Sequence, residues 1–529
     1  MGIAAASGCS RMHWSTPSPP ATIVAHPVVL DAHGKLLAWP RETSPYAHVV
    51  ELAWGFMKRV PVQPNGLPTY YSHSRFDPET FAGDSWPHNP AGLNAMLIDS
   101  AQLWHAFSGD REVIDLVIKS ADHQLAYGTT LPDAEWASVP FSSAGAGDTE
   151  YGGADDAWCD HCGRGDGVGF LEPDKVGELG LGYLRLWMLT DDVRYKTAAL
   201  SCASALAKHV RPGDATHSPW PFRVNAMTGV ARDEYTANTI GAIMLFDELL
   251  RLDLGDAPSI RRARGLARSW MMAHPMRNDA WSGFFEDIPI FEEPSDNPNQ
   301  YSPLQTAKYL LEHPEHDADW KEDVEHLIHF VADTFGGDEN NERGMQFGAN
   351  VMSEQRADMA KMASHTARYA AMNAMLYEKT GDPALLERAF RSFNWATYSC
   401  DDAGVVAVGE DRNEGWWFSD GYGDYIRHFL VGMAAIPEWA PARENHLLRS
   451  TSVVKSVTYD PTKVAYVTFD ASSTEVLRLR ARPAHVDAGG VAITERADLD
   501  ADGYTITPVG SGDFVVRIRH ANASVRIDL

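Results

Sequence analysis

The chain has 529 residues, of which 44% are hydrophobic, and it carries a formal net charge of −27. This acidic balance argues against nucleic acid as a partner, because phosphate binding needs clustered Lys and Arg. It also disfavours a strongly polyanionic substrate, although a local group of arginines would override the total. No apolar stretch reaches membrane-spanning length, so we expect no transmembrane segment.

Residues 1–45 contain several prolines and little periodicity, and we expect them to form an N-terminal tether. Within them, Ala6-Ser7-Gly8-Cys9 resembles a bacterial lipobox without the charged and apolar regions that normally precede one. One interpretation is a lipoprotein anchored at Cys9 whose start codon lies further upstream, and the other is an ordinary N-terminal tail. We therefore expect a protein of the bacterial cell envelope or a secreted one, with a cytoplasmic location as the alternative.

Apolar residues recur at helical spacing in twelve segments of the chain. In one segment, Val176, Leu179, Leu184, Trp187 and Met188 follow the 3.6-residue period. Such runs predict helices over residues 46–59, 92–107, 111–126, 176–190, 193–210, 237–252, 257–273, 303–312, 320–335, 357–379, 383–399 and 421–434.

Five short acidic turns separate helices that follow one another closely. They contain Asp110, Asp192, Asp256, Asp319 and Asp382, and the last four recur at intervals of 64, 63 and 63 residues. A near-constant period indicates stacked copies of one unit, here a helical hairpin. In such a turn a Gly ends the first helix, and an Asp or a hydroxyl side chain caps the first amides of the second.

The other connections are long and rich in Gly, Pro, Asp and aromatic residues. They cover residues 60–91, 128–174, 211–235, 275–302, 336–357 and 401–420. Loops this long inside a compact domain are usually either functional or evidence against the helix assignment, and six of them alternating with short turns favour function. Twelve helices with alternating short and long links fit six hairpins closed into a ring. Nearly all-apolar runs such as Gly177 to Leu189 suit its inner helices, and charged runs such as Trp320 to Phe335 suit its outer ones.

This helix pattern, together with the motifs EPDKVGELGLGYLRLW and FSDGYGDYIRHF, resembles the (α/α)6 toroid of the six-hairpin glycosidase superfamily. That superfamily also houses polysaccharide lyases and sugar epimerases. The resemblance covers roughly residues 46–435 and implies a mainly α fold, an (α/α)6 toroid of six helical hairpins, in a domain of residues 46–445. It also implies a cleft at the N-terminal ends of the inner helices, walled by the long loops.

Residues 446–529 differ in character from the helical part. Apolar residues there largely alternate with polar ones, and Gly489-Gly490 and Asp502-Gly503 supply turns. The pattern predicts a small C-terminal domain, an antiparallel β-sandwich.

Carboxylates gather where the long loops meet the predicted inner helices. Asp174 and Glu178 are four residues apart, so both project from one face of a helix start, where the helix dipole favours ionised carboxylates. This spacing suits binding of a sugar hydroxyl or activation of a water, although Asp174 is equally typical of an N-cap. Asp233, Glu234 and Tyr235 lead into the next inner helix, and capping explains only one of these two carboxylates.

The last long loop ends in a similar group. Asp420 and Asp424 share a helical face with Arg427, and the pair Trp416 and Trp417 precedes them. The apolar face of a sugar ring stacks on an indole while its hydroxyls bind charged groups. This combination is therefore typical of a glycan site.

The predicted helix over residues 357–379 carries a polar stripe. Asp358, Lys361, His365 and Arg368 follow one another at steps of three and four on a segment otherwise made largely of Ala and Met. On an outer helix such a stripe would face solvent, but the alternation of short and long links makes this an inner helix. His365 and Arg368 are therefore either part of a satisfied buried network or catalytic groups.

Several aromatic residues are candidates for substrate binding because they lie in or beside the long loops. Core packing would have placed most tryptophans on apolar helix faces. The candidates are Trp86, Trp220, Trp281, Tyr301, Trp416, Trp417 and Tyr422.

The cysteines support only a limited inference. Cys159, His161 and Cys162 could supply three ligands of a structural zinc, but a reliable zinc signature needs a second matching pair. A local disulfide or an unligated turn is the alternative. No catalytic metal and no cofactor are expected.

Three functions are compatible with these features. The first is a glycoside hydrolase that cleaves an oligo- or polysaccharide with two of the carboxylates above. The second is a polysaccharide lyase, in which Tyr235, His365, Arg368 and Tyr301 would act on a uronate-containing glycan. The third is a non-catalytic glycan-binding protein. The sequence carries no signal of oligomeric state.

Overall fold

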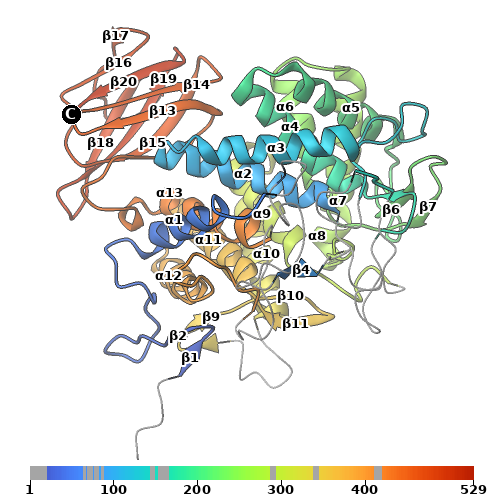
Figure 1. Cartoon of the computed structure of the whole chain (residues 1–529), viewed down its shortest axis with the longest axis horizontal. Coiled ribbons are helices and arrows are strands. Elements are labelled where there is room, and N and C mark those ends of the chain that lie inside the picture. Colours follow the sequence, from blue (N-terminus) through green and yellow to red (C-terminus); the bar gives the residue numbers. More distant parts are fainter. Residues whose placement is uncertain are drawn as a thin grey trace, which may run out of the picture.

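A computed structural model describes residues 21–62, 67, 75–76, 83–84, 89–142, 149–152, 166–285, 293–336, 345–409 and 420–529. The described part is mainly helical, and antiparallel sheets follow at its C-terminal end (Figure 1). The expected fold class is therefore confirmed at this level. No described helix combines the length and the apolarity that crossing a membrane requires.

The helices pack in pairs that are mostly consecutive in the chain. The pairs are α2 (Pro90–Ser108) with α3 (Glu112–Tyr127), α4 (Pro173–Thr190) with α5 (Val193–His209), α6 (Ile240–Arg251) with α7 (Ala257–Ala273), α9 (Tyr301–Glu312) with α10 (Trp320–Phe335), and α11 (Ala363–Thr380) with α12 (Pro383–Thr397). The last helix, α13 (Arg427–Ala435), contacts the first, α1 (Pro45–Met57). A short helix, α8 (Pro275–Asn278), follows α7.

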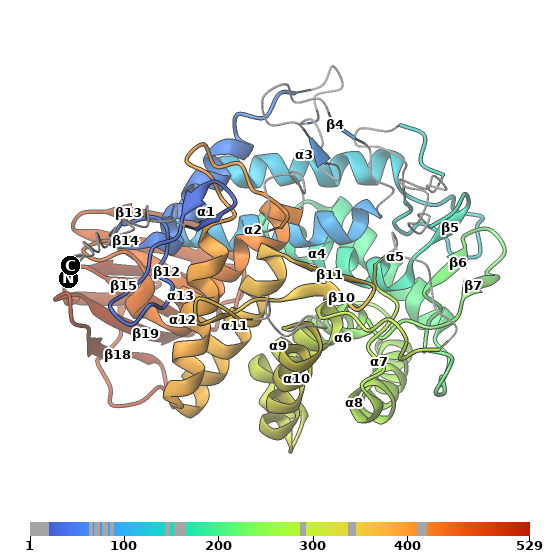
Figure 2. The ribbon, with the colours of Figure 1, turned by 90° about the horizontal axis from the view of Figure 1, so that it is seen from below.

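One helix of each pair takes part in a cycle of contacts. Helix α2 contacts α4, α4 contacts α6, α6 contacts α9, α9 contacts α11, α11 contacts α13, and α13 contacts α2 again. Helices α4 and α11 are buried along nearly their whole length, whereas α7 and α10 each bury one stripe. In Figure 2 the pairs α6–α7, α9–α10 and α11–α12 follow one another around the molecule. Burial of α4 and α11 on nearly all sides thus contrasts with the one-sided burial of α7 and α10.

The acidic turns cap their helices at three of five positions. The carboxylates of Asp110, Asp192 and Asp382 each accept a hydrogen bond from the amide two residues later. Gly109, with φ of 78°, provides the left-handed end of the preceding helix. The capping prediction fails at Asp256 and Asp319, whose side chains make no such bond.

The predicted helix over residues 357–379 begins later than expected. Residues Asp358–Lys361 form strand β11, which pairs with β10 (Ser353–Gln355), and α11 begins only at Ala363. The Lys361 ammonium donates to the carbonyl of Phe335 and to Ser353 Oγ. These contacts outside the segment favour a strand where the spacing alone favours a helix. Asp358 and Lys361 therefore do not continue the helical stripe of His365 and Arg368.

Short strands line the long connections. They are β1 (Thr22–Ile23), β2 (His26–Pro27), β3 (Arg75–Phe76), β4 (Gly83–Asp84), β5 (Phe170–Leu171), β6 (Arg223–Asn225), β7 (Ala231–Asp233), β8 (Met345–Gln346) and β9 (Ala349–Asn350). Strands β5, β6 and β7 form one antiparallel sheet in that order. This sheet brings the start of α4 beside the segment that leads into α6.

The C-terminal residues form two antiparallel sheets. One has the order β12-β15-β19-β18 and the other β13-β14-β20-β16-β17. The strands are β12 (His446–Ser450), β13 (Val454–Asp460), β14 (Lys463–Thr468), β15 (Ser473–Leu479), β16 (His485–Ala488), β17 (Val491–Ala492), β18 (Gly503–Pro508), β19 (Phe514–His520) and β20 (Ser524–Asp528). Their apolar side chains share a separate core, and β12 and β13 contact α2 (Figure 1).

Candidate active site at the helix N-termini

A chain of buried polar contacts joins the first turns of α4, α9 and α11. The Tyr301 hydroxyl donates to Glu178 Oε1 over 3.0 Å, and the Arg368 guanidinium lies over the Tyr301 ring, 4.6 Å from its centroid. Arg368 in turn pairs with Asp424. Asp424 belongs to a π-helical segment, η3 (Asp420–Tyr425), that precedes α13. Three helices of the contact cycle and the segment before a fourth thus place polar groups at one end.

Glu178 is a buried carboxylate whose hydrogen bonds all fall on one of its two oxygens. Its Oε1 accepts from Tyr301 and, over 2.9 Å, from the Asn238 amide. Within the described ranges no hydrogen-bond partner reaches its other oxygen, Oε2. Burial is the main cause that raises the pKa of Glu178, and the nearby Asp174 carboxylate adds to the shift while Lys175 opposes it. The carboxyl group therefore favours its protonated form more than an exposed glutamate does.

Two glycines make room for Glu178 between neighbouring helices. A Cβ atom at Gly241 of α6 would lie 2.6 Å from Glu178 Cγ. A Cβ atom at Gly92 of α2 would lie 3.4 Å from Glu178 Oε2 and 2.9 Å from Lys175 Cδ. The backbones of α2 and α6 therefore approach α4 closely beside Glu178 because Gly92 and Gly241 have no side chain.

Asp174 is held by Lys175 and Asn238. The Lys175 ammonium lies 3.1 Å from Asp174 Oδ2 and 3.4 Å from Glu172 Oε2, and it donates to the Phe284 carbonyl. The same Asn238 amide nitrogen that binds Glu178 donates to Asp174 Oδ2 over 3.0 Å. The two carboxylates therefore lie on one face of α4. Burial raises the pKa of Asp174, and the Lys175 charge counteracts part of the shift.

A second buried group surrounds His365. Gln300 bridges two of its members, because its Nε2 lies 2.7 Å from His365 Nδ1 while its Oε1 accepts from Arg368 over 2.8 Å. The amide orientation makes His365 Nδ1 the acceptor, so the ring proton is assigned to Nε2. Nε2 faces Glu354 Oε1 at 3.6 Å. We call His365, Glu354, Gln300 and Arg368 the His365 group.

Asp424 is the most strongly stabilised anion of the site. Arg427 donates to its Oδ1 over 2.8 Å, His428 Nε2 lies 3.2 Å from the same oxygen, and Arg368 binds Oδ2. Burial alone would raise the pKa of Asp424, but the charges of Arg368 and Arg427 outweigh it and hold the pKa well below its ordinary value. Asp424 is therefore ionised, with both oxygens engaged.

Three candidates from the loop before α6 lie apart from these contacts. Asp233 ends β7 and pairs with Arg223 and Arg232. The half-exposed Glu234 pairs with Arg211. The Tyr235 hydroxyl donates to the Ala280 carbonyl over 2.7 Å, and burial raises its pKa. The polar atoms of Asp233, Glu234 and Tyr235 therefore contact partners other than Glu178 and His365.

Most of the candidate aromatic residues within the described ranges lie in the core. Trp220, Trp281 and Tyr422 are at most 2% exposed. The Trp220 indole donates to the Leu206 carbonyl, and the Tyr422 hydroxyl donates to that of Gly404. The expectation that these three face substrate is corrected: their long connections fold back on the helices and bury large apolar rings. Tyr301 is buried as well, but its hydroxyl contacts Glu178.

Other expectations concern residues outside the described part. They are Trp86, Trp416 and Trp417, the side chain of Asp420, the candidate zinc ligands Cys159, His161 and Cys162, and the lipobox residue Cys9.

Sequence reasoning missed several members of the site. Lys175 was not singled out although it adjoins Asp174, and Arg223 of β6 pairs with Asp166 and lies 3.5 Å from Glu172. Gln300 and Glu354, both buried, come from loop segments without periodicity. Only the position of Gln300, three residues before the predicted helix over residues 303–312, offers a signal.

No protein-family model matches the sequence, and no curated protein does. Solved structures do match. Cellobiose 2-epimerase from Spirochaeta thermophila DSM 6192 aligns with 12% identity and a TM-score of 0.53, covering 75% of this chain and 99% of that chain. D-mannose isomerase aligns with 10% identity and a TM-score of 0.51, covering 76% and 99%. A family 76 glycoside hydrolase from a bovine Bacteroides thetaiotaomicron strain aligns with 13% identity and a TM-score of 0.48, covering 75% and 78%.

The two structures with TM-scores above 0.5 share the fold of most of this chain, in agreement with the resemblance in fold expected from the sequence. Identities this low concern the fold alone.

Proposed function

We propose that the chain is a carbohydrate-active enzyme that hydrolyses an oligo- or polysaccharide, with Glu178 as general acid. In this proposal residues 46–445 form an (α/α)6 toroid of six helical hairpins, residues 446–529 form a β-sandwich domain, and residues 1–45 are a tether. The protein would act in the cell envelope or outside the cell. The cycle of helix contacts and the two C-terminal sheets support this architecture.

The surroundings of Glu178 carry the functional proposal. A general acid must keep its proton near the working pH and must have an oxygen that can reach the leaving group. Burial raises the pKa of Glu178, and its Oε2 is unbonded among the described residues. Hydrolysis of a glycosidic bond needs one such protonated carboxyl beside a second, ionised one. The lowered pKa of Asp424 shows the opposite shift within the same chain of contacts.

Asp174 and Glu354 are the candidates for the second carboxylate. Asp424 is less suited because the two arginines and His428 already occupy both its oxygens. Asp174 shares the Asn238 amide with Glu178, and Glu354 faces His365. An Asp174→Gly or Glu354→Gly variant that regains activity with azide would identify a nucleophile, since azide replaces a missing carboxylate at the sugar carbon.

The test is turnover on a panel of plant, algal and bacterial polysaccharides. Hydrolysis releases one new reducing end per cut and produces no ultraviolet absorbance. Elimination also cuts the chain but leaves a carbon–carbon double bond that absorbs in the ultraviolet. Reducing ends without absorbance support the hydrolase, and absorbance that rises with each cut overturns it.

A second candidate is proton abstraction from a sugar carbon, as in a polysaccharide lyase. The His365 group favours it, because Gln300 links an imidazole to a guanidinium that could neutralise a uronate. Tyr301 is a poorer base because the pKa of its hydroxyl is raised well above the ordinary value, so the group keeps its proton. Burial is the main cause of this rise. Epimerisation of a free sugar uses the same step and would appear as new sugar signals by NMR with no bond cleaved.

The third possibility, a glycan-binding protein without catalysis, makes a different prediction. Alanine at Glu178, His365 or Asp424 would then leave the affinity for a bound glycan nearly unchanged, and no substrate on the panel would turn over.

A further inference from the structure

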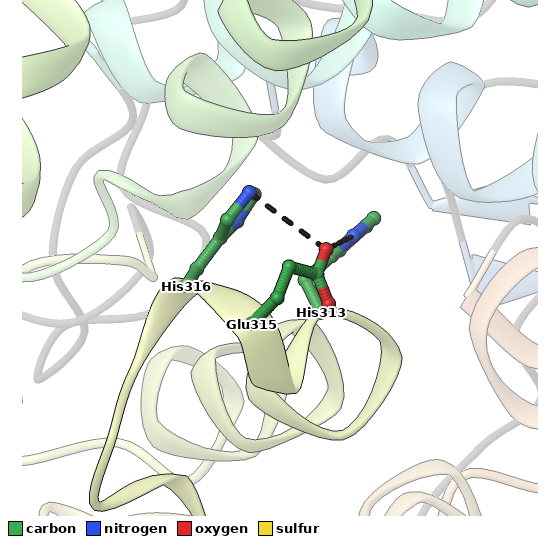
Figure 3. Close-up of side chains that lie close together, drawn as sticks. All are labelled: His313, Glu315 and His316. Atoms are coloured by element: carbon green, nitrogen blue, oxygen red, sulfur yellow. Dashed lines mark hydrogen bonds and ion pairs between the residues drawn. The ribbon is translucent and has the colours of Figure 1, made fainter.

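The turn between α9 and α10 groups three side chains that are typical metal ligands. His313, Glu315 and His316 lie in and beside the short helix η1 (Pro314–His316), and Figure 3 shows all three on one side of the turn. His313 Nδ1 lies 3.3 Å from Glu315 Oε1, and His316 Nε2 lies 3.8 Å from the same oxygen. One ligand atom from each residue lies within 4.8 Å of the other two. We call these three residues the His313 turn.

The backbone explains why the two imidazoles are neighbours. Residues three apart in a 3-10 helix lie nearly above one another. The His313 and His316 rings accordingly stack, with centroids 5.3 Å apart and an angle of 14° between their planes. Pro314 favours the first turn of such a helix because its φ is already restricted. The grouping thus follows from local geometry and not from a chance meeting of distant side chains.

A layer of hydrogen bonds behind the turn orients His316. The Tyr309 hydroxyl lies 2.6 Å from His316 Nδ1 and donates to Asp247 Oδ2 over 2.7 Å. With that proton given to Asp247, the Tyr309 oxygen is free to accept from Nδ1–H, which assigns the lone pair of the ring to Nε2. Arg264 also donates to Asp247 and to the Tyr309 oxygen. Metal-binding histidines characteristically donate their second ring nitrogen to such a partner.

We propose that the His313 turn binds a divalent transition metal ion, zinc by preference, through His313 Nδ1, Glu315 Oε1 and His316 Nε2. In a tetrahedral zinc site neighbouring ligand atoms are about 3.3 Å apart. The His313–Glu315 separation already fits, and the His316–Glu315 separation closes through rotation of the exposed Glu315 side chain. The two imidazole nitrogens, which lie within 4.8 Å of each other, approach through rotation of the half-exposed His313 side chain. Water completes the coordination on the solvent side. Two imidazoles and one carboxylate match the preference of zinc for nitrogen and oxygen ligands.

The His313 turn is separate from the candidate active site. It follows the C-terminal end of α9, whereas Tyr301 begins that helix, and twelve residues of α-helix span about 18 Å. A bound ion would join the end of α9 to the turn that leads into α10. We therefore expect it to stabilise this hairpin without entering the reaction, so the inference does not depend on the proposed function.

The first test is calorimetric titration of the chelator-treated full-length protein with zinc chloride at pH 7.5. His316→Ala should weaken binding about 10-fold or more, and Tyr309→Phe should weaken it less while leaving all three ligands in place. His326→Ala is the matched control, because His326 is another half-exposed histidine of this hairpin and pairs with Asp279. Unchanged affinity in His316→Ala, or equal loss in His326→Ala, would overturn the proposal.

Cobalt distinguishes this site from the cysteine motif. Cobalt(II) bound to nitrogen and oxygen gives visible bands without the strong near-ultraviolet band of a cobalt–thiolate bond. We expect visible bands that persist in Cys159→Ser/Cys162→Ser and vanish in His313→Gln/His316→Gln, with circular dichroism confirming that both variants fold. Bands that vanish only in the cysteine variant would place the ion at Cys159 and Cys162 and contradict the inference.

Discussion

Two buried glutamates, Glu178 in the helical part and Glu475 in the C-terminal sheets, have contrasting surroundings. Glu475 accepts from Ser450, Ser473, Tyr466 and His520, so each of its oxygens has two partners. Glu178 has both its partners on Oε1, and Oε2 has none among the described residues. A buried carboxylate with all its hydrogen bonds stabilises a fold. One with an unbonded oxygen costs free energy because it is desolvated without full compensation, and a functional role explains why it is kept.

Hydrogen bonding separates a carboxylate that is buried for stability from one that is buried for function. Both residues are nearly inaccessible to solvent, so exposure does not distinguish them. The number of hydrogen bonds, and the oxygen that accepts each of them, distinguish Glu178 from Glu475. If the distinction is correct, substitution of Glu178 should reduce activity more than stability, and substitution of Glu475 should reduce stability more than activity.

The largest expected effect is on catalysis at Glu178. Glu178→Gln keeps the shape and the bonds to Oε1 but removes the transferable proton, so kcat should fall about 100-fold or more. Stability should change little or rise, because a buried ionisable group is replaced by a neutral one. Steady-state kinetics and urea unfolding measure the two quantities. Activity within a factor of two of the unmodified protein would remove Glu178 from the mechanism.

The opposite result is expected at Glu475. Glu475→Gln leaves His520 and the hydroxyl donors without their anion, and breaking a buried pair of this kind costs about 3 kcal/mol. Urea unfolding followed by fluorescence should show the loss. Turnover per folded molecule should equal that of the unmodified protein, and a selective fall in kcat at unchanged stability would argue against the comparison.

The helical part shows which levels of structure the sequence reveals. Strong apolar periodicity places helices such as α7 and α10 at the predicted residues. The segment from residue 357 departs from its predicted helix. The backbone amides of Arg356 and Ala357, at its start, bind Pro298 and Asn297 of a distant loop. Periodicity reports only a segment's own preference, and such tertiary contacts override it.

The site was accessible from sequence only where helices carry it. Asp174, Glu178, His365, Arg368 and Asp424 lie on or beside helix starts, and the structure places them in the two linked groups. Glu354 and Gln300 lie in long connections, where no period relates position to burial. The same limit explains why Trp220 and Trp281 were expected in a cleft and lie in the core.

A smaller effect is expected from the glycine that makes room for Glu178. In Gly241→Ala the new methyl group would meet Glu178 Cγ at 2.6 Å, so the carboxyl must move. We expect a loss of about 1–3 kcal/mol in stability and of about 10-fold or more in kcat. Gly265→Ala on α7 is the control, since its Cβ meets open space and should stabilise the helix by up to about 1 kcal/mol. Equal effects of the two substitutions would show that Glu178 tolerates displacement.

The smallest effect concerns pH and separates the two regions once more. Both Glu178 and His520 have raised pKa values, although burial opposes the rise at His520 and its Glu475 partner causes it. A raised folded pKa means that the folded state binds the extra proton, so stability falls as pH rises. For Glu178 the fall begins near the ordinary value of 4.5, and for His520 near 6.5, each continuing through the folded pKa.

Unfolding curves across pH 4 to 9 should therefore lose the lower step in Glu178→Gln and the upper step in His520→Gln. Activity should follow only the first of these groups, because a general acid stops working once its proton is lost. The alkaline limb of the kcat profile should be unchanged in His520→Gln. A shift of that limb in His520→Gln would mean that titration in the sheets reaches the helical site, and the two regions would then not be independent.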